Sequence, residues 1–390
     1  MAALPVAWFA AAGSSRSPGG RGRRSFAKPW QRRASPLART GLLAYTLLLI
    51  DASLYPWVGW RDRGIGLFDY LRGPWPAYFT SFDVVVNVLG YVPLTMLAAL
   101  AVYPRWRGAA ALAGALAYGV LLSAGLEAAQ TLLPARVASL LDLATNAAGA
   151  LIGAVLGTRL APAFLDRGRL RELRLQWFER DASLGLVVVA LWFAALLYPD
   201  VYPFAPGGVL KPVVDAVLAA FDWQESWRLD PAHFVWGEAV LAVLSIGGAG
   251  ALLLAQARPF APRLAMALAF VVLSILAQTI SAVLSAATER PFAWFTQGAQ
   301  LGVLGALALL AVQTRLPLVW RARIGLFALT GLVLVTGLLP ANPYFAAQPA
   351  WAYGQFLNLH GLTFGIHLVW PLFALAALLR PAAGAAARPL

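Results

Sequence analysis

The sequence predicts an all-α, polytopic integral membrane protein with about ten transmembrane helices, and three observations support this fold class. Of the 390 residues, 60% are hydrophobic and only 12% are charged, whereas soluble domains carry about 25% charged residues. The mean hydropathy is +0.70. Ten segments are apolar over the roughly 17–25 residues that a transmembrane helix needs. They lie near 39–57, 82–103, 109–133, 138–158, 183–199, 232–255, 262–286, 291–314, 322–340 and 359–379.

The connections between these segments assign a direction to each helix in turn. One side of the membrane receives 23 basic and four acidic residues, in both terminal tails and in connections 105–107, 159–182, 258–263 and 315–323. The other side receives seven basic residues. Because basic loops stay in the cytoplasm, this alternation predicts a multi-pass protein of the cell membrane with both termini cytoplasmic.

The same segments divide the chain into five parts. These are a basic, disordered cytoplasmic tail (1–38), a four-helix membrane domain (39–160), a charged cytoplasmic linker (161–182), a second four-helix copy (183–315) and two further helices with a short tail (316–390). Residues 1–39 hold eight basic residues and no acid. A basic tail beside an apolar helix indicates contact with anionic lipid. The bilayer is therefore an expected partner and nucleic acid is not, while the oligomeric state stays open.

The chain has no cysteine and only three histidines. Disulfides and thiol chemistry are therefore excluded, and a histidine-rich metal site is not expected. His360 and His367 lie seven residues apart on one helix face, without a third ligand in view. We expect neither a metal nor another cofactor.

A faint internal repeat adds to this organisation. Segments 122–123 and 145–150 match 273–274 and 296 onward at a constant offset of 151 residues. Both four-helix copies begin on the cytoplasmic side, so the pattern predicts a parallel repeat of four, four and two helices.

Aromatic residues are concentrated in two of the outer connections. They are Trp57, Trp60, Phe68, Tyr70, Trp75, Tyr78, Phe79, Tyr202, Phe204, Phe221, Trp223 and Trp227. We interpret them as an interfacial belt; the alternative is a cover over an outward-facing site.

Seven polar side chains of the first four helices share one level near the outer face. They are Asp83, Asn87, Glu127, Gln130, Arg136, Asp142 and Asn146. Within each helix the acid and the amide lie three or four residues apart, which places them on the same face. Ionisable groups inside a membrane are costly and face a protein interior or a wet cavity. The set therefore predicts a polar pocket open to the outside.

Several short motifs connect these residues. They are Glu127-x-x-Gln130, Leu133-Pro134-x-Arg136, Asp142-x-x-x-Asn146 and Gly149-x-x-x-Gly153, preceded by Asp83-x-x-x-Asn87 with Gly90 and Pro93. Together they resemble the VanZ-like membrane domain over about residues 39–160. The resemblance implies a bacterial cell-envelope protein similar to proteins linked to low-level teicoplanin resistance. It does not imply a defined biochemical activity.

Each candidate site residue has a functional and a structural interpretation. In the functional one, Glu127 is a catalytic acid or base or a hydrogen-bonding centre. Gln130, Asn146 and Asn87 then orient a ligand, while Arg136, Asp142 and Asp83 shape its rim. In the structural one, the Glu127 carboxylate ties the third helix to the fourth, and the asparagines form interhelical hydrogen bonds.

Two further interpretations concern packing. We interpret Asp142 and Arg136 as a salt bridge that shapes the turn between the third and fourth helices. Gly149, Gly153 and Gly157 recur every four residues, which permits close helix contact.

The second copy lacks most of the polar set. At the same offset, Glu127, Arg136, Asp142 and Asn146 correspond to Gln278, Ala287, Ala293 and Gln297. Its one retained acid, Glu238, is a further candidate for the same pocket.

Three function classes follow, and the sequence leaves open whether the protein is an enzyme. The first is recognition or modification of a lipid- or glycan-linked substrate, such as a cell-wall precursor, at the outward pocket. The second is a proton-coupled transporter in which Glu127 titrates. The third is a non-catalytic membrane scaffold.

Overall fold

The computed structural model describes residues 34–73, 75, 79–223, 231–285, 291–346 and 359–386. Residues 34–390 form one compact unit. Most of the predicted basic tail therefore lies outside the described residues. The first helix, α1, begins at Pro36, three residues before the predicted segment: the Ser35 hydroxyl accepts the Ala38 N–H, and Pro36 occupies the first turn.

The described residues are helical throughout their regular structure, apart from one isolated bridge between Phe178 and Ala257. The membrane-length helices are α1 (Pro36–Leu54), α2 (Ser81–Val102), α3 (Gly108–Gln130), α4 (Leu140–Pro162), α8 (Pro231–Ala255), α9 (Arg263–Ser285), α10 (Gln297–Arg315), α11 (Leu318–Leu338) and α14 (Leu359–Ala386). The shorter elements are η2 (Asp69–Leu71), η3 (Ala163–Arg167), α5 (Arg169–Trp177), α6 (Ser183–Ala195), α7 (Lys211–Ala220) and α12 (Pro343–Ala346).

Nine helices among the described residues are long and apolar enough to cross a membrane. This confirms the all-α membrane fold. The tenth segment, predicted near 183–199, is α6, which has only 13 residues and spans about 20 Å. After Ala195 the chain turns more tightly, with the Leu197 N–H on the Ala194 carbonyl and the Tyr198 N–H on the Ala195 carbonyl, and Pro199 has no N–H to continue the helix.

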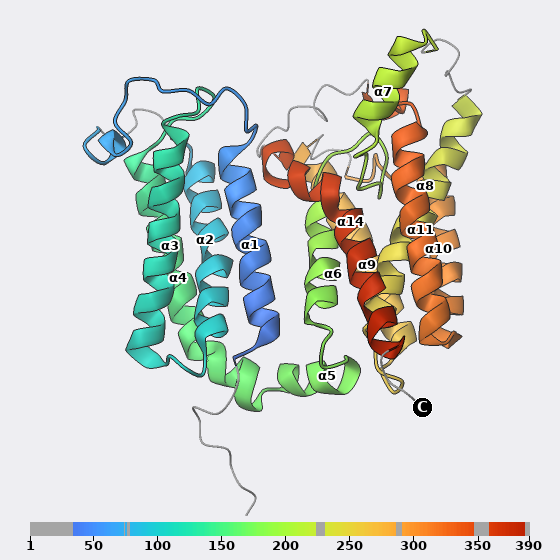
Figure 1. The fold of residues 1–390 in the computed structure, drawn as a ribbon, viewed down its shortest axis with the longest axis horizontal. Coiled ribbons are helices and arrows are strands. Elements are labelled where there is room, and N and C mark those ends of the chain that lie inside the picture. The colour runs from blue at the N-terminus through green and yellow to red at the C-terminus, as the bar shows by residue number, and fades with distance from the viewer. Residues whose placement is uncertain are drawn as a thin grey trace, which may run out of the picture. The chain divides into compact units, whose positions relative to one another are not determined.

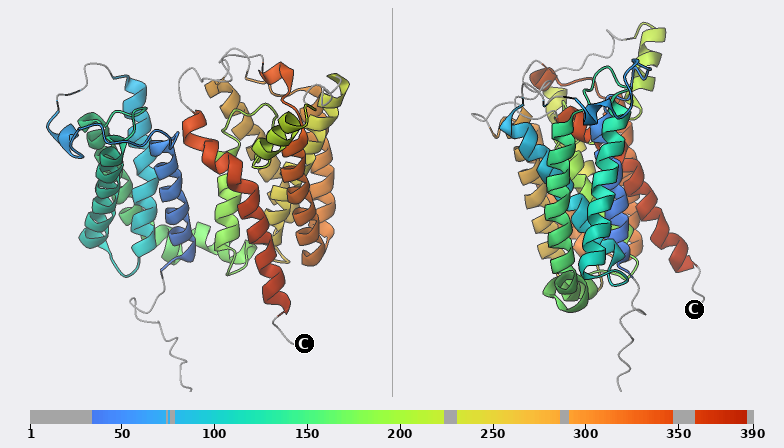
Figure 2. Two further views of the ribbon diagram at one scale, coloured as in Figure 1. Left: turned by 45° about the horizontal axis from the view of Figure 1, so that its top comes forward. Right: turned by 90° about the vertical axis from the view of Figure 1, so that its left-hand side faces the viewer.

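The long helices run side by side in two groups within residues 34–390 (Figures 1 and 2). We call α1–α4 the first bundle and α6, α8–α11 and α14 the second bundle. The arginine-rich helix α5 lies across the helix ends between them in Figure 1. Helix α1 joins the two bundles through contacts with α6 and α14.

Small residues bring α2 and α4 together in the first bundle. A Cβ atom on Gly149 would lie 2.2 Å from the Val88 carbonyl oxygen, and one on Gly153 would lie 2.1 Å from that of Val92. Thr95 adds a hydrogen bond from its hydroxyl to the Ala150 carbonyl at 2.8 Å. The predicted packing role of these glycines is confirmed, since any side chain would push the two helices apart.

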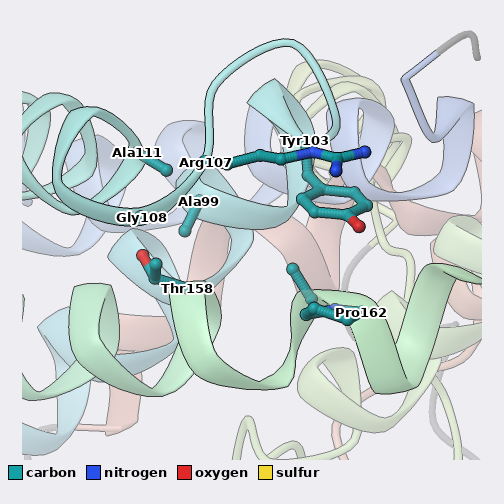
Figure 3. Close-up of a pocket in the computed structure, with 8 residues that line it drawn as sticks. Ala99, Tyr103, Arg107, Gly108, Ala111, Thr158 and Pro162 are labelled. Atoms are coloured by element: carbon teal, nitrogen blue, oxygen red, sulfur yellow. The ribbon is translucent and has the colours of Figure 1, made fainter. Parts of the chain in front are cut away.

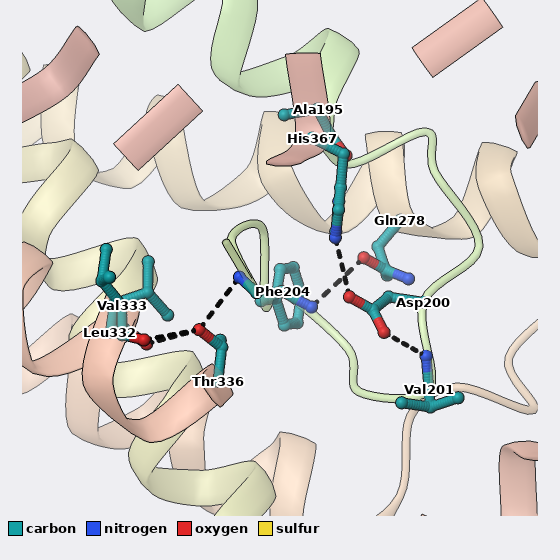
Figure 4. Close-up of polar contacts among 10 residues, drawn as sticks. Ala195, Asp200, Val201, Phe204, Gln278, Leu332, Val333, Thr336 and His367 are labelled. Atoms are coloured by element: carbon teal, nitrogen blue, oxygen red, sulfur yellow. Dashed lines mark hydrogen bonds and ion pairs between the residues drawn. The ribbon is translucent and has the colours of Figure 1, made fainter. Parts of the chain in front are cut away.

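The second bundle is filled by its own chain at the end where α6 finishes. Tyr202 and Phe204 follow α6 and are only 5% and 1% exposed. The Phe204 N–H donates to Gln278 Oε1 at 3.4 Å (Figure 4). The Phe204 ring meets the Trp294 ring edge-on, with 5.3 Å between the centroids. Gly208 N–H donates to the Thr336 hydroxyl at 3.2 Å. We call residues 200–208 the plug.

These contacts correct the interpretation of the outer aromatics. Trp57 and Trp60 are 43% and 42% exposed, as a belt requires, whereas Tyr202 and Phe204 belong to the core. The reason is the plug, which returns into the bundle instead of staying in the interface. Tyr78 and Trp227 lie outside the described residues.

Candidate functional site

The first bundle contains a cavity of about 820 Å³ at the end where α1 finishes and α2 begins. All seven candidate polar residues of the sequence analysis line it. Apolar and aromatic residues of α1 and α2 complete the wall, among them Tyr45, Leu48, Leu49, Leu89 and Tyr91. The structure therefore brings the whole predicted polar set to one cavity.

Glu127 is the most deeply buried acid of this cavity, with an exposed fraction of 4%. It lies in the last turns of α3. Its Oε2 atom accepts the backbone N–H of Ser139, the N-cap residue of α4, at 2.8 Å. The carboxylate thus ties α3 to the start of α4, where an anion complements the free N–H groups and the positive end of the helix dipole.

Gln130 and Arg136 hold the end of α1. Gln130 Nε2 donates to the Ser53 carbonyl at 2.9 Å. Arg136 donates from Nε to the Tyr55 carbonyl at 2.9 Å and from Nη2 to the Ala52 carbonyl at 3.0 Å. These carbonyls at the end of a helix lack helical partners, and a cation there also complements the helix dipole. Burial lowers the pKa of Arg136, but a guanidinium remains charged at neutral pH.

The predicted salt bridge between Arg136 and Asp142 is wrong in the described structure. Asp142 Oδ1 instead accepts a hydrogen bond from Asn87 Nδ2 at 2.8 Å. The Arg136 guanidinium donates instead to the carbonyls at the end of α1, through Nε and Nη2. Asp142 and Asn87 therefore link α4 to α2 by a charge-assisted hydrogen bond.

Asn146 and Asp83 differ in their exposure to solvent, although both line the cavity. Asn146 is 6% exposed; its Nδ2 donates to the Ser123 hydroxyl at 3.0 Å, and its Oδ1 is buried without a partner among the described residues. Asp83 is exposed at the start of α2, where it forms a capping box with Thr80. Asp83 thus has a local structural function in addition to its place at the rim.

The sequence analysis missed three contributions to this cavity. Tyr45 donates to the Gly90 carbonyl at 2.9 Å and so joins α1 to α2 beneath the polar wall. Ser139 lines the cavity and supplies the N–H that Glu127 accepts. Gly361 of α14 also lines it. The tyrosine on an apolar helix was a visible signal, whereas the contribution of α14 is a long-range contact.

Tyr70 connects the outer loop to the same helix end. It is 8% exposed and its hydroxyl donates to the Ala124 carbonyl of α3 at 3.1 Å. Burial raises the pKa of Tyr70, and the nearby charge of Glu127 raises it further. The phenol therefore stays neutral and keeps its hydrogen bond at neutral pH.

Glu238, the acid of the second bundle that the sequence analysis considered for this cavity, lies elsewhere. Glu238 is not among the cavity's lining residues. It is 4% exposed and accepts hydrogen bonds from the Thr296 hydroxyl and from Asn342 Nδ2. Glu238 therefore joins α8 to α10 and to residue 342, within the second bundle.

Polar side chains also gather at two other places in the described structure. A second cavity, of about 130 Å³, lies at the opposite ends of α2–α4, beside Tyr103, Arg107 and Thr158 (Figure 3). In the second bundle, His367 contacts Asp200 Oδ2 through Nε2 at 2.7 Å and the Ala195 carbonyl through Nδ1 at 3.1 Å (Figure 4). Both ring nitrogens of His367 thus have protein partners.

The described part of the chain contains no group of three or more histidine, cysteine, aspartate or glutamate side chains placed to hold a metal ion. The side chain of His360, the other histidine considered above, lies outside the described residues.

The helices and the cavity together define a multi-pass membrane protein with a polar site in its first bundle. Residues 42–161 match the family model described as VanZ/LLP1. This part of the chain is therefore a VanZ/LLP1 domain, in agreement with the resemblance over 39–160. Searches of curated proteins and of solved structures found no match to the chain.

Proposed function

We propose that the first bundle recognises a lipid- or glycan-linked molecule of the cell envelope in the cavity between α1 and α4. One observation carries the proposal. A cavity of about 820 Å³ contains polar atoms of Glu127 and Asn146, two side chains that are otherwise buried. Its size is typical of small-molecule sites, and uncompensated polar groups at membrane depth favour a functional explanation.

The contacts refine the role of each residue in this proposal. Glu127 and Asn146 face the ligand. Gln130 and Asn87 are positioning residues, because their amide donors are bonded to Ser53 and Asp142. Arg136 fixes the end of α1 at the rim. We propose recognition and no chemical step, since no activated nucleophile accompanies Glu127 among the described residues.

We further propose that the cavity faces outward and that both termini are cytoplasmic. The support is the charge distribution: 23 basic residues belong to the side opposite the cavity and seven to its own side. The start of α1, helix α5 and the end of α14 lie at the same end of the helices in Figure 1.

We also propose that the second bundle is a diverged copy of the first. The glycine contact of Gly149 with the Val88 carbonyl is matched by Gly298 with Val235, and that of Gly153 with Val92 by Gly302 with Ala239. These contacts favour offsets of 149 residues for α4 with α10 and 147 for α2 with α8. The uniform offset of 151 does not describe them, which explains why Glu238 does not occupy the place of Asn87.

The scaffold hypothesis is the second candidate, and the Glu127–Ser139 contact favours it. A carboxylate that holds the start of α4 has a structural task even without a ligand. The transporter hypothesis has less support. Beside the cavity's lining residue Tyr91, the apolar residues Leu94 and Ala150 are fully buried and pack with it, which gives a transport path no polar continuation at that place.

Glycopeptide susceptibility tests the proposal. Wild type, Glu127→Gln, Glu127→Leu and the second-bundle control Glu238→Gln would be produced at matched membrane levels and compared for susceptibility to teicoplanin and vancomycin. We expect wild type and Glu238→Gln to reduce teicoplanin susceptibility. We expect Glu127→Gln to lose that effect while remaining folded, because glutamine can still accept the Ser139 N–H.

The other outcomes separate the candidates. Full activity of Glu127→Gln, with loss of both activity and folded protein in Glu127→Leu, would favour the scaffold. Wild type without any effect on either antibiotic would overturn a glycopeptide-related function.

A further inference from the structure

Several hydrogen-bond donors of the cavity are used by the protein itself. Gln130 Nε2 and two Arg136 nitrogens donate to backbone carbonyls of α1's end at 2.9–3.0 Å. A carbonyl can only accept, so the nitrogen of Gln130 must face it and the Gln130 oxygen must face away. The three N–H groups in these bonds are not available to a ligand, whereas the Gln130 oxygen remains as an acceptor.

The two asparagines are arranged in the same way. Asn87 Nδ2 donates to the Asp142 carboxylate at 2.8 Å and Asn146 Nδ2 to the Ser123 hydroxyl at 3.0 Å. Their oxygens therefore remain as acceptors. Asn146 Oδ1 is buried and has no partner among the described residues, although Asn146 is only 6% exposed. An unpaired buried acceptor destabilises the fold, and a donor from a ligand would satisfy it.

The carboxylates of the lining also leave hydrogen-bond acceptors for a ligand. Glu127 and Asp142 each use one oxygen in a described hydrogen bond, from Ser139 N–H and Asn87 respectively, which leaves the second oxygen of each. Asp83 adds a third carboxylate at the rim, against the one guanidinium of Arg136 among the described lining residues. The described wall therefore holds three carboxyl groups and one guanidinium, a balance that favours a cationic head over an anionic one.

The remaining wall accommodates an apolar chain. Leu48 and Leu49 of α1 and Leu89 of α2 line the cavity. Leu89 lies six residues deeper along α2 than Asp83, about 9 Å, and is 61% exposed, so it also faces the bilayer side of the helix. The cavity thus combines an acceptor-rich upper wall with an apolar side wall that continues to the lipid.

We propose that this cavity binds an amphiphile with a protonated amine head, which donates to Glu127, Asp142 and Asn146, while its chain lies along Leu48 and Leu89. This inference rests on the proposed function, because it names the chemistry of the molecule that the cavity recognises. A sugar head also donates hydrogen bonds but carries no charge to balance the carboxylates. Charge-assisted hydrogen bonds are about twice as strong as neutral ones.

Competitive binding to the purified full chain in nanodiscs tests the head group. The reporter is a dodecylamine labelled at its chain end with a fluorophore, followed by fluorescence anisotropy. Dodecylamine, dodecanol, dodecyl maltoside and dodecanoate are the competitors, so that the chain is constant and only the head changes. We expect dodecylamine to displace the reporter at a concentration at least about tenfold lower than the other three.

Matched variants locate the binding. Glu127→Gln and Asp142→Asn keep the acceptors for Ser139 N–H and Asn87 but remove the charge, and each should weaken dodecylamine binding about tenfold. Glu238→Gln removes a buried carboxylate of the second bundle, and Thr158→Ala alters the smaller cavity; neither should change binding. Size-exclusion profiles of all four variants verify that they are folded.

The outcomes distinguish this inference from the proposed function. Equal competition by dodecanol or dodecyl maltoside, with binding still lowered by cavity variants that leave the profile intact, would overturn the amine head and keep the cavity as an amphiphile site. Preference for dodecanoate would do the same. Reporter binding that no cavity variant changes, or no saturable binding at all, would overturn both.

Discussion

The two bundles of this protein pack a pair of helices through similar glycine contacts, but only the first has a large cavity where the second is filled by the plug. Both join two helices through glycines that approach a neighbouring carbonyl, Gly153 in the first bundle and Gly302 in the second. The first bundle keeps a cavity of about 820 Å³ at the end where α1 finishes. The second bundle fills the end where α6 finishes with the plug, whose Phe204 is 1% exposed.

The buried acceptor side chain is a carboxylate at the cavity of the first bundle and a neutral amide at the plug of the second. In the first bundle Glu127 accepts an N–H from Ser139. In the second, Gln278 accepts an N–H from Phe204, a residue of the plug itself. The comparison teaches that a neutral acceptor suits a site that the protein fills permanently, whereas a carboxylate leaves a charge that a ligand can satisfy.

Removal of the Phe204 ring, the buried aromatic side chain of the plug, should have the largest effect on stability. We expect Phe204→Ala to destabilise the protein by about 3–5 kcal/mol, because a fully buried ring leaves a void. The matched change Leu89→Ala, at the wall of the first bundle's cavity, should cost less than about 1 kcal/mol, since Leu89 is 61% exposed. Thermal unfolding in detergent measures both. Equal losses would show that these two ends do not differ in packing.

A substitution at the α2–α4 contact should follow in size. Gly153→Ala places a Cβ 2.1 Å from the Val92 carbonyl oxygen, so the helices must separate, at a cost of about 1–3 kcal/mol. Gly125→Ala in α3 is the control, because no atom lies within 4 Å of its Cβ position. The fraction of monodisperse protein after heating reports the difference. An intact midpoint for Gly153→Ala would contradict the proposed function of this glycine in packing.

Exchanging the buried acceptors of the two bundles, with Gln278→Glu and Glu127→Gln, tests whether a charge is tolerated at each. We expect Gln278→Glu to lower stability by about 1–3 kcal/mol, because it buries a charge where Gln278 is only 3% exposed. Glu127→Gln should leave stability unchanged or raise it slightly, since the amide oxygen still accepts the Ser139 N–H. Both midpoints would be measured at pH 7. A stable Gln278→Glu protein would remove the distinction between the two sites.

The smallest effect should come from pH. Each bundle places a tyrosine beside a buried glutamate: burial raises the pKa of Tyr70 and of Tyr202, and the charges of Glu127 and Glu238 raise these pKa values further. With the folded pKa above the unfolded value near 10, the stability is fully present below about pH 10 and is lost as the pH rises through the folded pKa.

Tyrosine-to-phenylalanine variants test this dependence. We expect Tyr70→Phe and Tyr202→Phe each to flatten part of the decline in thermal midpoint between about pH 9 and 12, with a loss of about 0.6 kcal/mol at neutral pH from the missing hydrogen bond. An unchanged alkaline decline in both variants would assign it to other groups.

Much of the site could be predicted from local spacing. The pairs Glu127 with Gln130 and Asp142 with Asn146 were placed on common helix faces, and all four line the cavity. The partners could not be predicted. Arg136 bonds to carbonyls 81 and 84 residues away instead of Asp142, because free carbonyls at a helix end compete for a guanidinium and only the folded chain brings them there.

The sequence by itself determined the membrane fold, nearly every helix and the level of the polar residues. These depend on hydropathy and helical periodicity, which act over one or two turns of the chain. Only the tertiary structure decided that α6 is short, that the plug fills the second bundle and that the first bundle keeps its cavity. Those outcomes depend on which distant side chains meet, and on whether a buried polar atom finds its partner within the chain or remains for a ligand.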